Sequence, residues 1–593
     1  MAKRFAVIVY PLLLVLVFRC SSFSGRNLYE FITWMGEEVA AHPFDFTWTK
    51  HTLPVLLVFT LFYVAIWMLI ISSMKNVMPG IEHGSAEWTD PKTVTKEYGA
   101  KGNSKDLPKQ QRDVILTRNA RVCLDKLQHN VNTLVHGGSG TMKTRGYILP
   151  NLLQLNCNPV ITDPKGEILR KTGHFLKKMG YDIRVLDLNH PYKSHGYNPF
   201  AYIRDDGDIL KFVNMFWETT RDKRASQSDQ IWDDQAKAML ISFIMYLHHF
   251  GRPEDLNFET VWYLFQNMDA SEQKKGLDPI DKMFHQHPED PAFGYYNTWN
   301  AAKGKTLSSI RSTFSARLSM FSLDTLQSLT RTDEMNILDL TDKKVAIFMI
   351  LPDNGDTSYN FLAGTLYAHI FQLLYDYADN VHHGPLPRPV RFFMDEFANI
   401  CLPDNFQNIL STARSRNISF IIVIQDLQQL EALYKDYFKV LKANCPWRLF
   451  LGSTEKDSLQ EWSDMLGKQT VIVRSRTRNY GKQGGSSIQE NAVERPLLFP
   501  DEVKRYARRW RCILITPDGH NIKDLKYNLK KHPFYKEVSE KKFFFSRKVP
   551  LYLWGEADLS IGNMRLIDSH YGGKIASLPQ TDYVLLDPEE ETA

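Results

Sequence analysis

The chain lacks closely spaced cysteines. Its six cysteines lie far apart in 593 residues, and no two of them form a C-x-x-C pair. This spacing excludes a disulfide scaffold and a short-spaced zinc ribbon, and it favours free thiols in a reducing compartment. The chain also has little excess charge, +5 in total. Any binding of nucleic acid must therefore come from local basic patches.

No internal repeat is visible, and the composition is that of a globular protein. Hydrophobic residues make up 43% of the chain and charged residues 23%, which argues against a disordered or fibrous protein. The length of 593 residues exceeds that of one ordinary core, which spans roughly 100–200 residues. We therefore expect two or more domains.

Long apolar runs are confined to the first 75 residues. Residues 53–73 carry no charge and have the length of a membrane-spanning helix, whereas the uncharged run at 5–18 is shorter. The shorter run suits either a cleaved signal peptide or a first span, and we favour the span because no clear cleavage site follows. Basic residues at the outer flanks place both ends in the cytoplasm. Residues 1–75 are thus expected to be a membrane anchor with two transmembrane helices.

The rest of the chain alternates strand and helix patterns. A polar linker at 76–130 leads into this part, in which short β-branched runs precede glycine-rich turns and helical segments. Such alternation predicts an α/β fold with a parallel sheet and crossover helices. Helical periodicity interrupts it at 206–330 and predicts an all-α insertion domain. Later strand patterns lie at 345–351, 390–396, 418–425 and 447–452. The α/β domain is expected in two parts, 131–205 and 331–530, followed by a C-terminal extension at 531–593.

A glycine-rich turn with a lysine follows the first strand pattern. It comprises Gly137, Gly138, Ser139, Gly140, Thr141, Met142, Lys143 and Thr144. The backbone N–H groups of such a turn and the helix start bind phosphates, the lysine reaches the β- and γ-phosphates, and the threonine ligates Mg²⁺. The phosphate-loop pattern has glycine where Met142 stands. The alternative is a glycine-rich turn with a chance lysine.

An apolar strand pattern that ends in two acids decides between these interpretations. Asp395 and Glu396 directly follow Phe392–Met394. Beside a phosphate loop, the first acid would hold Mg²⁺ and the second would polarise the attacking water. A strand with a solvated acidic end is common on its own. Together with the turn, however, it predicts a phosphate-loop NTPase that binds ATP and Mg²⁺.

Residues around a further strand pattern complete the predicted site. Gln425 ends the pattern at 418–425, where a polar side chain can respond to the γ-phosphate. Arg414 and Arg416 precede that strand, and either could act as an arginine finger on a neighbouring subunit's nucleotide. We choose Arg414. The alternative for these residues is an ordinary strand end or a solvated helical face.

Basic residues are interleaved with aromatic ones near the end of the α/β part. They include Lys504, Arg505, Arg508, Arg509, Arg511, Lys526, Lys530, Lys531, Lys541 and Lys542. This composition can bind a phosphate backbone and stack bases, although a solvated face is the more common explanation. Arg474, Arg476 and Arg478 alternate, so they share one side of a strand. Residues 481–491 have the composition of a flexible loop.

These motifs give the chain a resemblance to the type IV secretion coupling proteins, the TraG/TraD group of conjugative ATPases, which is related to the FtsK and HerA motors. The resemblance extends from the apolar runs to about residue 530. It is carried by HGSAEW (83–88), GGSGTMKT (137–144), TDPKGE (162–167), YNPF (197–200), FFMDEF (392–397), ARSRNISFIIVIQ (413–425) and RPLLFPDEV (495–503).

The resemblance implies a RecA-like ATPase of the inner membrane that forms a ring, expected to be a homo-hexamer. It implies that the two α/β parts make one nucleotide-binding domain and that the insertion meets the substrate. That substrate would be a relaxase joined to single-stranded DNA, handed to type IV secretion channel proteins during conjugative transfer. Asp163 and Lys165 would either link the nucleotide state to a neighbour or form a structural turn.

Two other functions stay open at this point. One is a coupling ATPase that passes only protein effectors. The other is a membrane receptor for substrates that kept the fold and lost hydrolysis, which Met142 would permit. ATP turnover separates the receptor from the ATPases, and stimulation of turnover by DNA separates the two ATPases.

Overall fold

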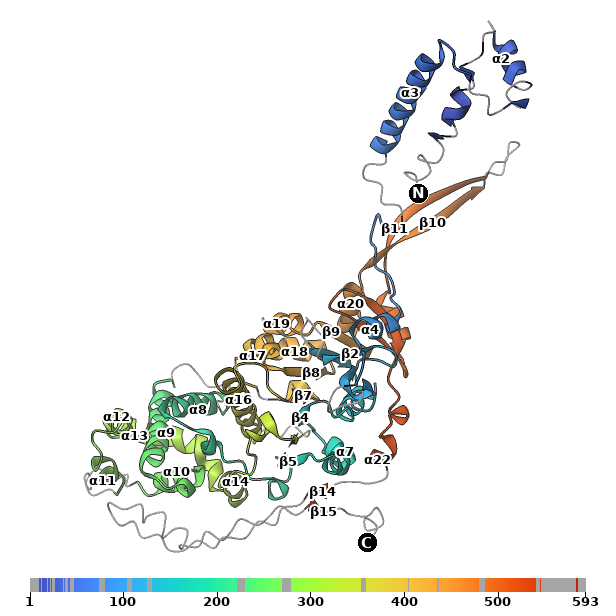
Figure 1. Cartoon of the computed structure of the whole chain (residues 1–593). Helices are drawn as coiled ribbons and strands as arrows, with labels where there is room; N and C mark the ends of the chain where they lie inside the picture. The colour runs from blue at the N-terminus through green and yellow to red at the C-terminus, as the bar shows by residue number, and fades with distance from the viewer. Residues whose placement is uncertain are drawn as a thin grey trace. The chain divides into compact units, whose positions relative to one another are not determined.

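The computed structural model of the chain divides into two compact units. The first comprises Met1–Ser85 with Gln469–Arg495, and the second Ala86–Lys468 with Pro496–Ala593. Their elements are shown in Figure 1. The residues described are 10–11, 13–18, 20–21, 23, 27–35, 37, 41–42, 47–73, 80–103, 109–124, 131–220, 230–268, 279–352, 359–400, 402–403, 405–434, 437–478, 486–539, 544–545 and 583–584.

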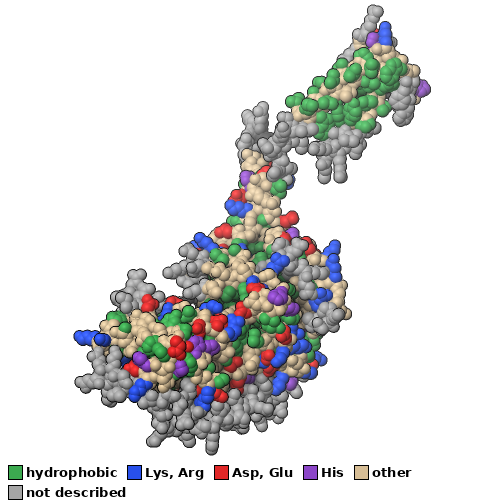
Figure 2. Space-filling view, turned by 60° about the vertical axis from the view of Figure 1, so that its left-hand side comes forward, with side chains coloured by type: hydrophobic (Ala, Val, Ile, Leu, Met, Phe, Trp, Pro, Cys, Tyr) green, Lys and Arg blue, Asp and Glu red, His purple; other side chains and the backbone are tan. Residues whose placement is uncertain are grey.

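The first unit contains helices α2 (Leu28–Trp34) and α3 (Thr52–Ser73). Among the described residues, α3 alone is long and apolar enough to cross a membrane. Only 6% of its apolar stretch Thr52–Leu69 is buried within the protein. Figure 2 shows the hydrophobic side chains that gather on the surface of this unit. One of the two predicted transmembrane helices is therefore supported by the structure.

The shorter apolar run, residues 5–18, lies only partly within the described residues, and those are helical. The hydroxyls of Tyr10 and Thr60 lie 3.0 Å apart, and the ring of Tyr10 lies 4.9 Å from that of Tyr63. The run thus contacts α3. A second span is not shown, because the described helical residues are too few to cross a bilayer.

A separate two-stranded sheet consists of β10 (Lys468–Arg478) and β11 (Ser486–Pro496), the long ribbon in Figure 1. The loop predicted at 481–491 is therefore wrong from Ser486 onward. Pairing with β10 stabilises a strand whose Ser, Gln and Asn content indicates a loop when it is considered alone. Arg474 Nε lies 2.7 Å from Glu490 Oε1, so this arginine is paired within the ribbon.

The described residues of the second unit form a nine-stranded sheet in the order β13-β12-β9-β3-β8-β7-β4-β6-β5. The seven strands from β9 to β5 are parallel, whereas β12 pairs antiparallel with β9 and β13 pairs antiparallel with β12. The predicted α/β fold with a parallel sheet is confirmed. The strands predicted at 345–351, 390–396, 418–425 and 447–452 correspond to β6, β7, β8 and β9. The strands are β3 (Thr133–Gly137), β4 (Asn158–Thr162), β5 (Asp182–Asp187), β6 (Val345–Ile350), β7 (Val390–Met394), β8 (Ile418–Ile424), β9 (Trp447–Gly452), β12 (Arg511–Ile515) and β13 (Asn521–Leu525).

Each face of this sheet has its own core, because successive strand residues point to opposite faces. In β7, Phe392 lies in one core and Phe393 in the other. The first core includes α16 (Asn360–Asp376), α17 (Phe406–Thr412), α18 (Leu427–Tyr434) and α19 (Tyr437–Ala443). The second includes α4 (Pro91–Tyr98), α6 (Leu149–Leu152), α7 (Glu167–Lys178), α22 (Tyr535–Ser539), β1 (Asp113–Ile115) and β2 (Arg121–Cys123).

Smaller elements complete the unit. A third cluster of buried side chains packs α20 (Lys456–Met465) and α21 (Pro500–Tyr506) against β9 and β12. The five described cysteines are free, as expected, and four of them are buried. The remaining short elements are α5 (Lys109–Arg112), α15 (Asp339–Asp342) and the paired strands β14 (Phe544–Phe545) and β15 (Tyr583–Val584).

Residues 206–330 contain helices and no strand within their described part. The apolar side chains of these helices, among them Phe216, Phe243 and Phe258, join the first core beside α16. The helices are α8 (Asp206–Thr219), α9 (Gln230–Phe250), α10 (Phe258–Gln266), α11 (Pro279–His285), α12 (Pro291–Asn300), α13 (Lys305–Leu318) and α14 (Asp324–Thr330).

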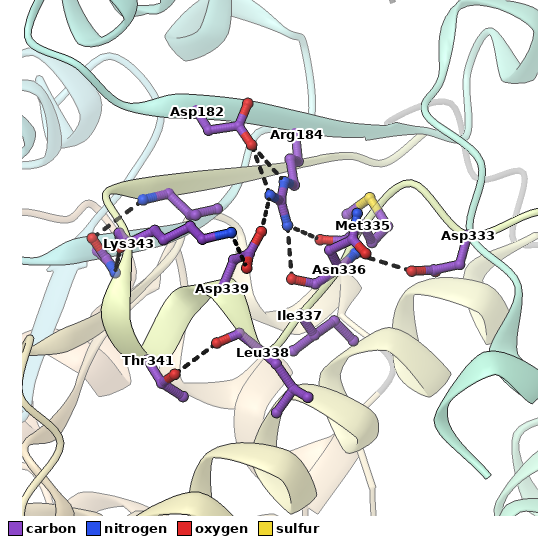
Figure 3. Close-up of polar contacts among 12 residues, drawn as sticks. Asp182, Arg184, Asp333, Met335, Asn336, Ile337, Leu338, Asp339, Thr341 and Lys343 are labelled. Carbon is purple, nitrogen blue, oxygen red and sulfur yellow. Dashed lines mark hydrogen bonds and ion pairs between the residues drawn. The ribbon is translucent and has the colours of Figure 1, made fainter. Parts of the chain in front are cut away.

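The chain returns from these helices to the sheet through a segment fixed by Arg184 (Figure 3). Arg184 lies on the edge strand β5 and is only 6% exposed. Its guanidinium donates to the carbonyl of Asn336 (2.7 Å) and to the carboxylates of Asp182 (2.7 Å) and Asp339 (2.5 Å). It also donates to the carbonyl of Met335. One buried cation thus ties the exit of the helical region to the edge of the sheet.

Candidate nucleotide-binding site

The glycine-rich turn directly follows β3 and is folded tightly against its neighbours. A Cβ at Gly137 would lie 2.4 Å from Thr141 Oγ1 and 3.1 Å from Leu451 Cβ, so a side chain there would force these neighbours to shift. The N–H of Gly138 donates to the carbonyl of Gly452 at the end of β9 (2.9 Å). Ser139 and Gly140 form the exposed tip. A helical segment begins at Thr144, so the strand, turn and helix start of a phosphate loop are all present.

Met142 adopts the backbone conformation that favours glycine. Its φ is +71°, close to the +73° of Gly140. A left-handed conformation costs a side-chain-bearing residue roughly 1–2 kcal/mol. The glycine of the common pattern therefore has a steric reason, and this chain places methionine there at a cost in strain.

Lys143, Thr144 and Asp395 meet at the mouth of the turn. Lys143 Nζ donates to the carbonyl of Gly138 (3.1 Å), and Thr144 Oγ1 donates to Asp395 Oδ2 (2.9 Å). Burial lowers the pKa of Lys143, while the nearby charges of Asp395 and Glu396 oppose this shift. Burial also raises the pKa of Asp395, which is 7% exposed. The lysine and both acids thus form one charge cluster.

Glu396 and Gln425 extend this cluster along the sheet edge. Gln425 Nε2 donates to Glu396 Oε1 (3.1 Å), and the N–H of Glu396 donates to Asp395 Oδ1 (3.2 Å). The sheet order explains the contact, because β8 lies between β3 and β7 and all three run parallel. Their carboxyl ends therefore meet at one edge, which is where parallel α/β sheets bind ligands.

The two candidate arginines differ in their surroundings. Arg416 pairs with Asp379 (2.6 Å), and its guanidinium lies 4.2 Å from the ring centre of Tyr375. It is therefore held within its own chain. Arg414 is exposed. Both precede the seven-residue strand β8. They therefore lie at the amino ends of the parallel strands, opposite the carboxyl ends, where Lys143 lies.

The oxygen atoms of Thr144 and Asp395 fit a magnesium ion that is shared with nucleotide phosphates. Mg²⁺ is commonly bound by one or two protein oxygens together with phosphates and waters. The described residues contain no group of three or more His, Cys, Asp and Glu side chains that could hold a metal by themselves. The donor set therefore suits a metal that arrives with the nucleotide.

Asp163 lies next to the acids of the site and has a structural contact. It follows β4, the neighbour of β7, and is 2% exposed. Its Oδ2 accepts the N–H of Leu169 (2.8 Å) at the start of α7, and Gly166 in this turn has a φ of +64°. These contacts are those of a structural turn. Burial, together with the charge of Asp395, raises the pKa of Asp163 to about 7.

Lys526 also contacts the glycine-rich turn, and the sequence does not predict this contact. Its neighbours in the sequence group it with basic residues that could contact nucleic acid, but it is 3% exposed, and its Nζ donates to the carbonyl of Thr141 (2.9 Å). A buried lysine cannot bind an external phosphate backbone, so that interpretation is wrong for Lys526. No local pattern signals the contact, because 385 residues separate the two partners. Lys541 and Lys542 lie outside the described residues.

The fold and the site define a parallel α/β protein with a phosphate-loop turn at the carboxyl ends of its strands. Residues 87–551 match the family model described as type IV secretory system conjugative DNA transfer. The chain belongs to this family, the coupling proteins of type IV secretion.

Curated relatives of the chain are named as conjugal transfer or coupling proteins. The chain is 22% identical over 407 residues to the conjugal transfer protein TraG of Escherichia coli, a match that covers 64% of this chain and 62% of the relative. It is 21% identical over 407 residues to the type IV secretion system-coupling protein VirD4 of Bartonella quintana, covering 65% and 61%. The chain thus spans less than two thirds of the length of these relatives.

Solved structures show the same fold. The bacterial conjugative coupling protein TrwBdeltaN70 superposes with a TM-score of 0.54 at 15% identity, covering 76% of this chain and 97% of that one. The plasmid coupling protein TrwB in complex with the non-hydrolysable ATP analogue ADPNP gives a TM-score of 0.52 at 15% identity, covering 76% and 96%.

Proposed function

We propose that this chain is a membrane-anchored, ring-forming ATPase that couples a relaxase–single-stranded DNA substrate to a type IV secretion channel during conjugative transfer. The observation that carries the proposal is the set of contacts at one sheet edge. Lys143, Thr144, Asp395, Glu396 and Gln425 are linked there by hydrogen bonds and charge. Membership of the conjugative transfer family supports the substrate class.

Each side chain has a role that follows from its position. Lys143 would leave the Gly138 carbonyl to contact the β- and γ-phosphates. Thr144 and Asp395 would hold Mg²⁺, which supplies positive charge against the phosphates when it is bound. Glu396 would orient and polarise the attacking water. The hydrogen bond from Gln425 fixes the Glu396 carboxylate and links it to β8.

The ring is proposed because an arginine from a neighbouring subunit commonly stabilises the charge that develops on the γ-phosphate in such ATPases. Arg414 lies at the opposite edge, so it suits the nucleotide of a neighbouring subunit. Arg416 suits this role less, because it is less exposed than Arg414. A closed ring, expected to have six subunits, would pair each site with the next subunit's arginine.

The test is ATP turnover by the full chain in detergent, with and without single-stranded DNA. Lys143→Ala should weaken nucleotide binding, whereas Glu396→Gln should leave ATP bound but uncleaved. Turnover that DNA stimulates supports the conjugative function. Turnover without DNA stimulation favours a coupling ATPase for protein effectors. Nucleotide binding without any turnover in the unmodified protein favours the non-hydrolysing receptor.

The proposed anchor has two spans, α3 and the helical run that contacts it through Tyr10. With two spans, a reporter fused after Ser73 should lie in the cytoplasm. A reporter that is active on the periplasmic side would show that only one span crosses the membrane.

A further inference from the structure

Lys526 reaches the phosphate loop from a fixed position. It directly follows β13, and its backbone N–H donates to the carbonyl of Trp510 (2.7 Å). Its side chain passes Gly146, where an added Cβ would lie 3.9 Å from Lys526 Cβ, and ends at the carbonyl of Thr141 (2.9 Å). Backbone and side chain together place an ammonium group against one peptide of the loop.

The ammonium is charged although it is buried. Burial lowers the pKa of Lys526 to about 8, which keeps the group mostly protonated at neutral pH. A buried charge is unfavourable unless polar groups compensate it. The ammonium donates to the carbonyl oxygen of Thr141 rather than to a carboxylate. The contact is therefore a charge-assisted hydrogen bond to the loop backbone, which is stronger than a neutral one.

This hydrogen bond acts on the peptide that precedes Met142. In a trans peptide the C=O and N–H groups point in opposite directions. With the Thr141 carbonyl turned toward Lys526, the N–H of Met142 points away from the lysine. The same peptide orientation accompanies the left-handed conformation of Met142, with φ at +71°.

We propose that Lys526 is a positioning residue of the nucleotide site. Its ammonium holds the Thr141–Met142 peptide so that the Met142 N–H is available to the phosphates, and it offsets the strain of methionine at a glycine position. The inference rests on the proposed nucleotide binding. The sequence motifs place the site at the ends of β3, β7 and β8. The proposal adds a residue at the end of β13 to that site.

The proposal predicts a coupling between Lys526 and Met142. The measurement is the dissociation constant of ADP with Mg²⁺ for the full chain in detergent. Lys526→Met should weaken binding about tenfold, because a hydrogen bond to a charged group is lost. In the Met142→Gly background the same change should weaken binding about threefold or less, because glycine adopts the left-handed conformation without strain.

Thermal unfolding separates positioning from folding. Methionine has a similar shape and removes a buried charge, so Lys526→Met should unfold at the same temperature as the unmodified protein or higher. Lys526→Arg should retain most of the affinity. Lys530→Met, a change at an exposed lysine four residues away, should leave affinity unchanged.

Each outcome decides the inference. Losses of affinity that are equal with and without the Met142→Gly change, or no loss in either case, would overturn it. If Lys526→Met does not fold, Lys526→Leu is measured instead, because it also removes the donor to the Thr141 carbonyl, and the same comparison of backgrounds applies. Failure of the unmodified protein to bind ADP would overturn the proposed function itself.

Discussion

Met142 is the residue at which this chain departs from the phosphate-loop pattern. Because its φ is +71°, Met142→Gly should relieve strain, while the greater freedom of glycine in the unfolded chain offsets part of the gain. We expect nucleotide affinity to be equal or higher and the free energy of unfolding to change by less than about 1 kcal/mol. Nucleotide titration and thermal unfolding measure the two quantities. A large loss of affinity would show that the Met142 side chain makes a required contact.

Asp163 predicts a dependence of stability on pH. Its pKa is raised to about 7 in the folded protein from 3.8, so the folded state favours the protonated carboxyl. Its contribution to stability is present below about pH 4 and is lost as the pH rises through about 7. Asp163→Asn keeps an acceptor for the Leu169 N–H without this titration. We therefore expect the variant to unfold at a higher temperature than the unmodified protein at pH 8.

The matched comparison for this prediction is made at pH 5, where the advantage of Asp163→Asn should be much smaller. A difference in unfolding temperature that is the same at pH 5 and pH 8 would contradict the prediction. It would mean that Asp163 is ionised in the folded protein over this whole range.

At the scale of elements, the segment that joins α14 to β6 depends on Arg184. Arg184→Met leaves the carbonyls of Met335 and Asn336 without the guanidinium donor, and it leaves Asp339 with Lys343 as its remaining cation. We expect the free energy of unfolding to fall by about 2 kcal/mol, because the Arg184 side chain is buried whereas that of Asp339 is partly exposed. Urea unfolding of the full chain in detergent measures it.

Lys343 provides the control for the Arg184 prediction. It also pairs with Asp339 (2.8 Å), but its side chain is 70% exposed. Lys343→Met should therefore cost less than about 0.5 kcal/mol. Equal losses for the two variants would show that the segment is fixed by packing rather than by the guanidinium.

The parallel strands of the sheet could be predicted because each is a short apolar run with a turn signal at its end. The strand patterns at 345–351, 390–396, 418–425 and 447–452 correspond to β6 to β9. The contacts among the phosphate loop, the two acids and Gln425 follow from the same logic, since parallel strands bring their carboxyl ends together. Local sequence was sufficient here because burial on both faces leaves a continuous hydrophobic signal.

Features that depend on distant partners could not be predicted. β11 has the composition of a loop and is a strand because β10 pairs with it. The contact of Lys526 with Thr141 joins elements at opposite ends of the second unit's sequence. Antiparallel strands β12 and β13 bring that lysine to the loop, and no periodic pattern signals such an addition. The positive φ of Met142 is indicated only by the glycine that the phosphate-loop pattern has at this position, because the side-chain chemistry of methionine gives no sign of it.

At the scale of the whole molecule, the proposed ring predicts that activity returns when two inactive variants are mixed. Arg414→Ala would remove the proposed finger that a subunit offers its neighbour, and Glu396→Gln would remove the group proposed to position water. In mixed rings some sites combine an intact Glu396 with an intact Arg414 from the next subunit. Partial ATP turnover should therefore return. The recovery should be easy to detect, because such a finger raises turnover by about 10³–10⁵-fold.

The mixing experiment requires that each variant still assembles, which sedimentation of the detergent-solubilised protein can establish. Arg416→Ala is the comparison, because its pairing with Asp379 indicates a structural role. Mixtures with this variant should show no such recovery. If assembled mixtures of the Arg414 and Glu396 variants stay inactive, Arg414 does not act between subunits.

The position of β3 in the sheet has a consequence for the synthesis and folding of the protein on the ribosome. β3 carries the phosphate loop, yet its two neighbours are β8 and β9. The ribosome makes these strands roughly 300 residues later, which at 5–20 residues per second takes roughly 15–60 s. During that interval α3 has already emerged and can enter the lipid, while β3 has no partner on either edge. A nascent chain with the proposed anchor would therefore reach the membrane before β9 can pair with β3, and a chain that stops before residue 447 lacks Gly452, whose carbonyl accepts the N–H of Gly138.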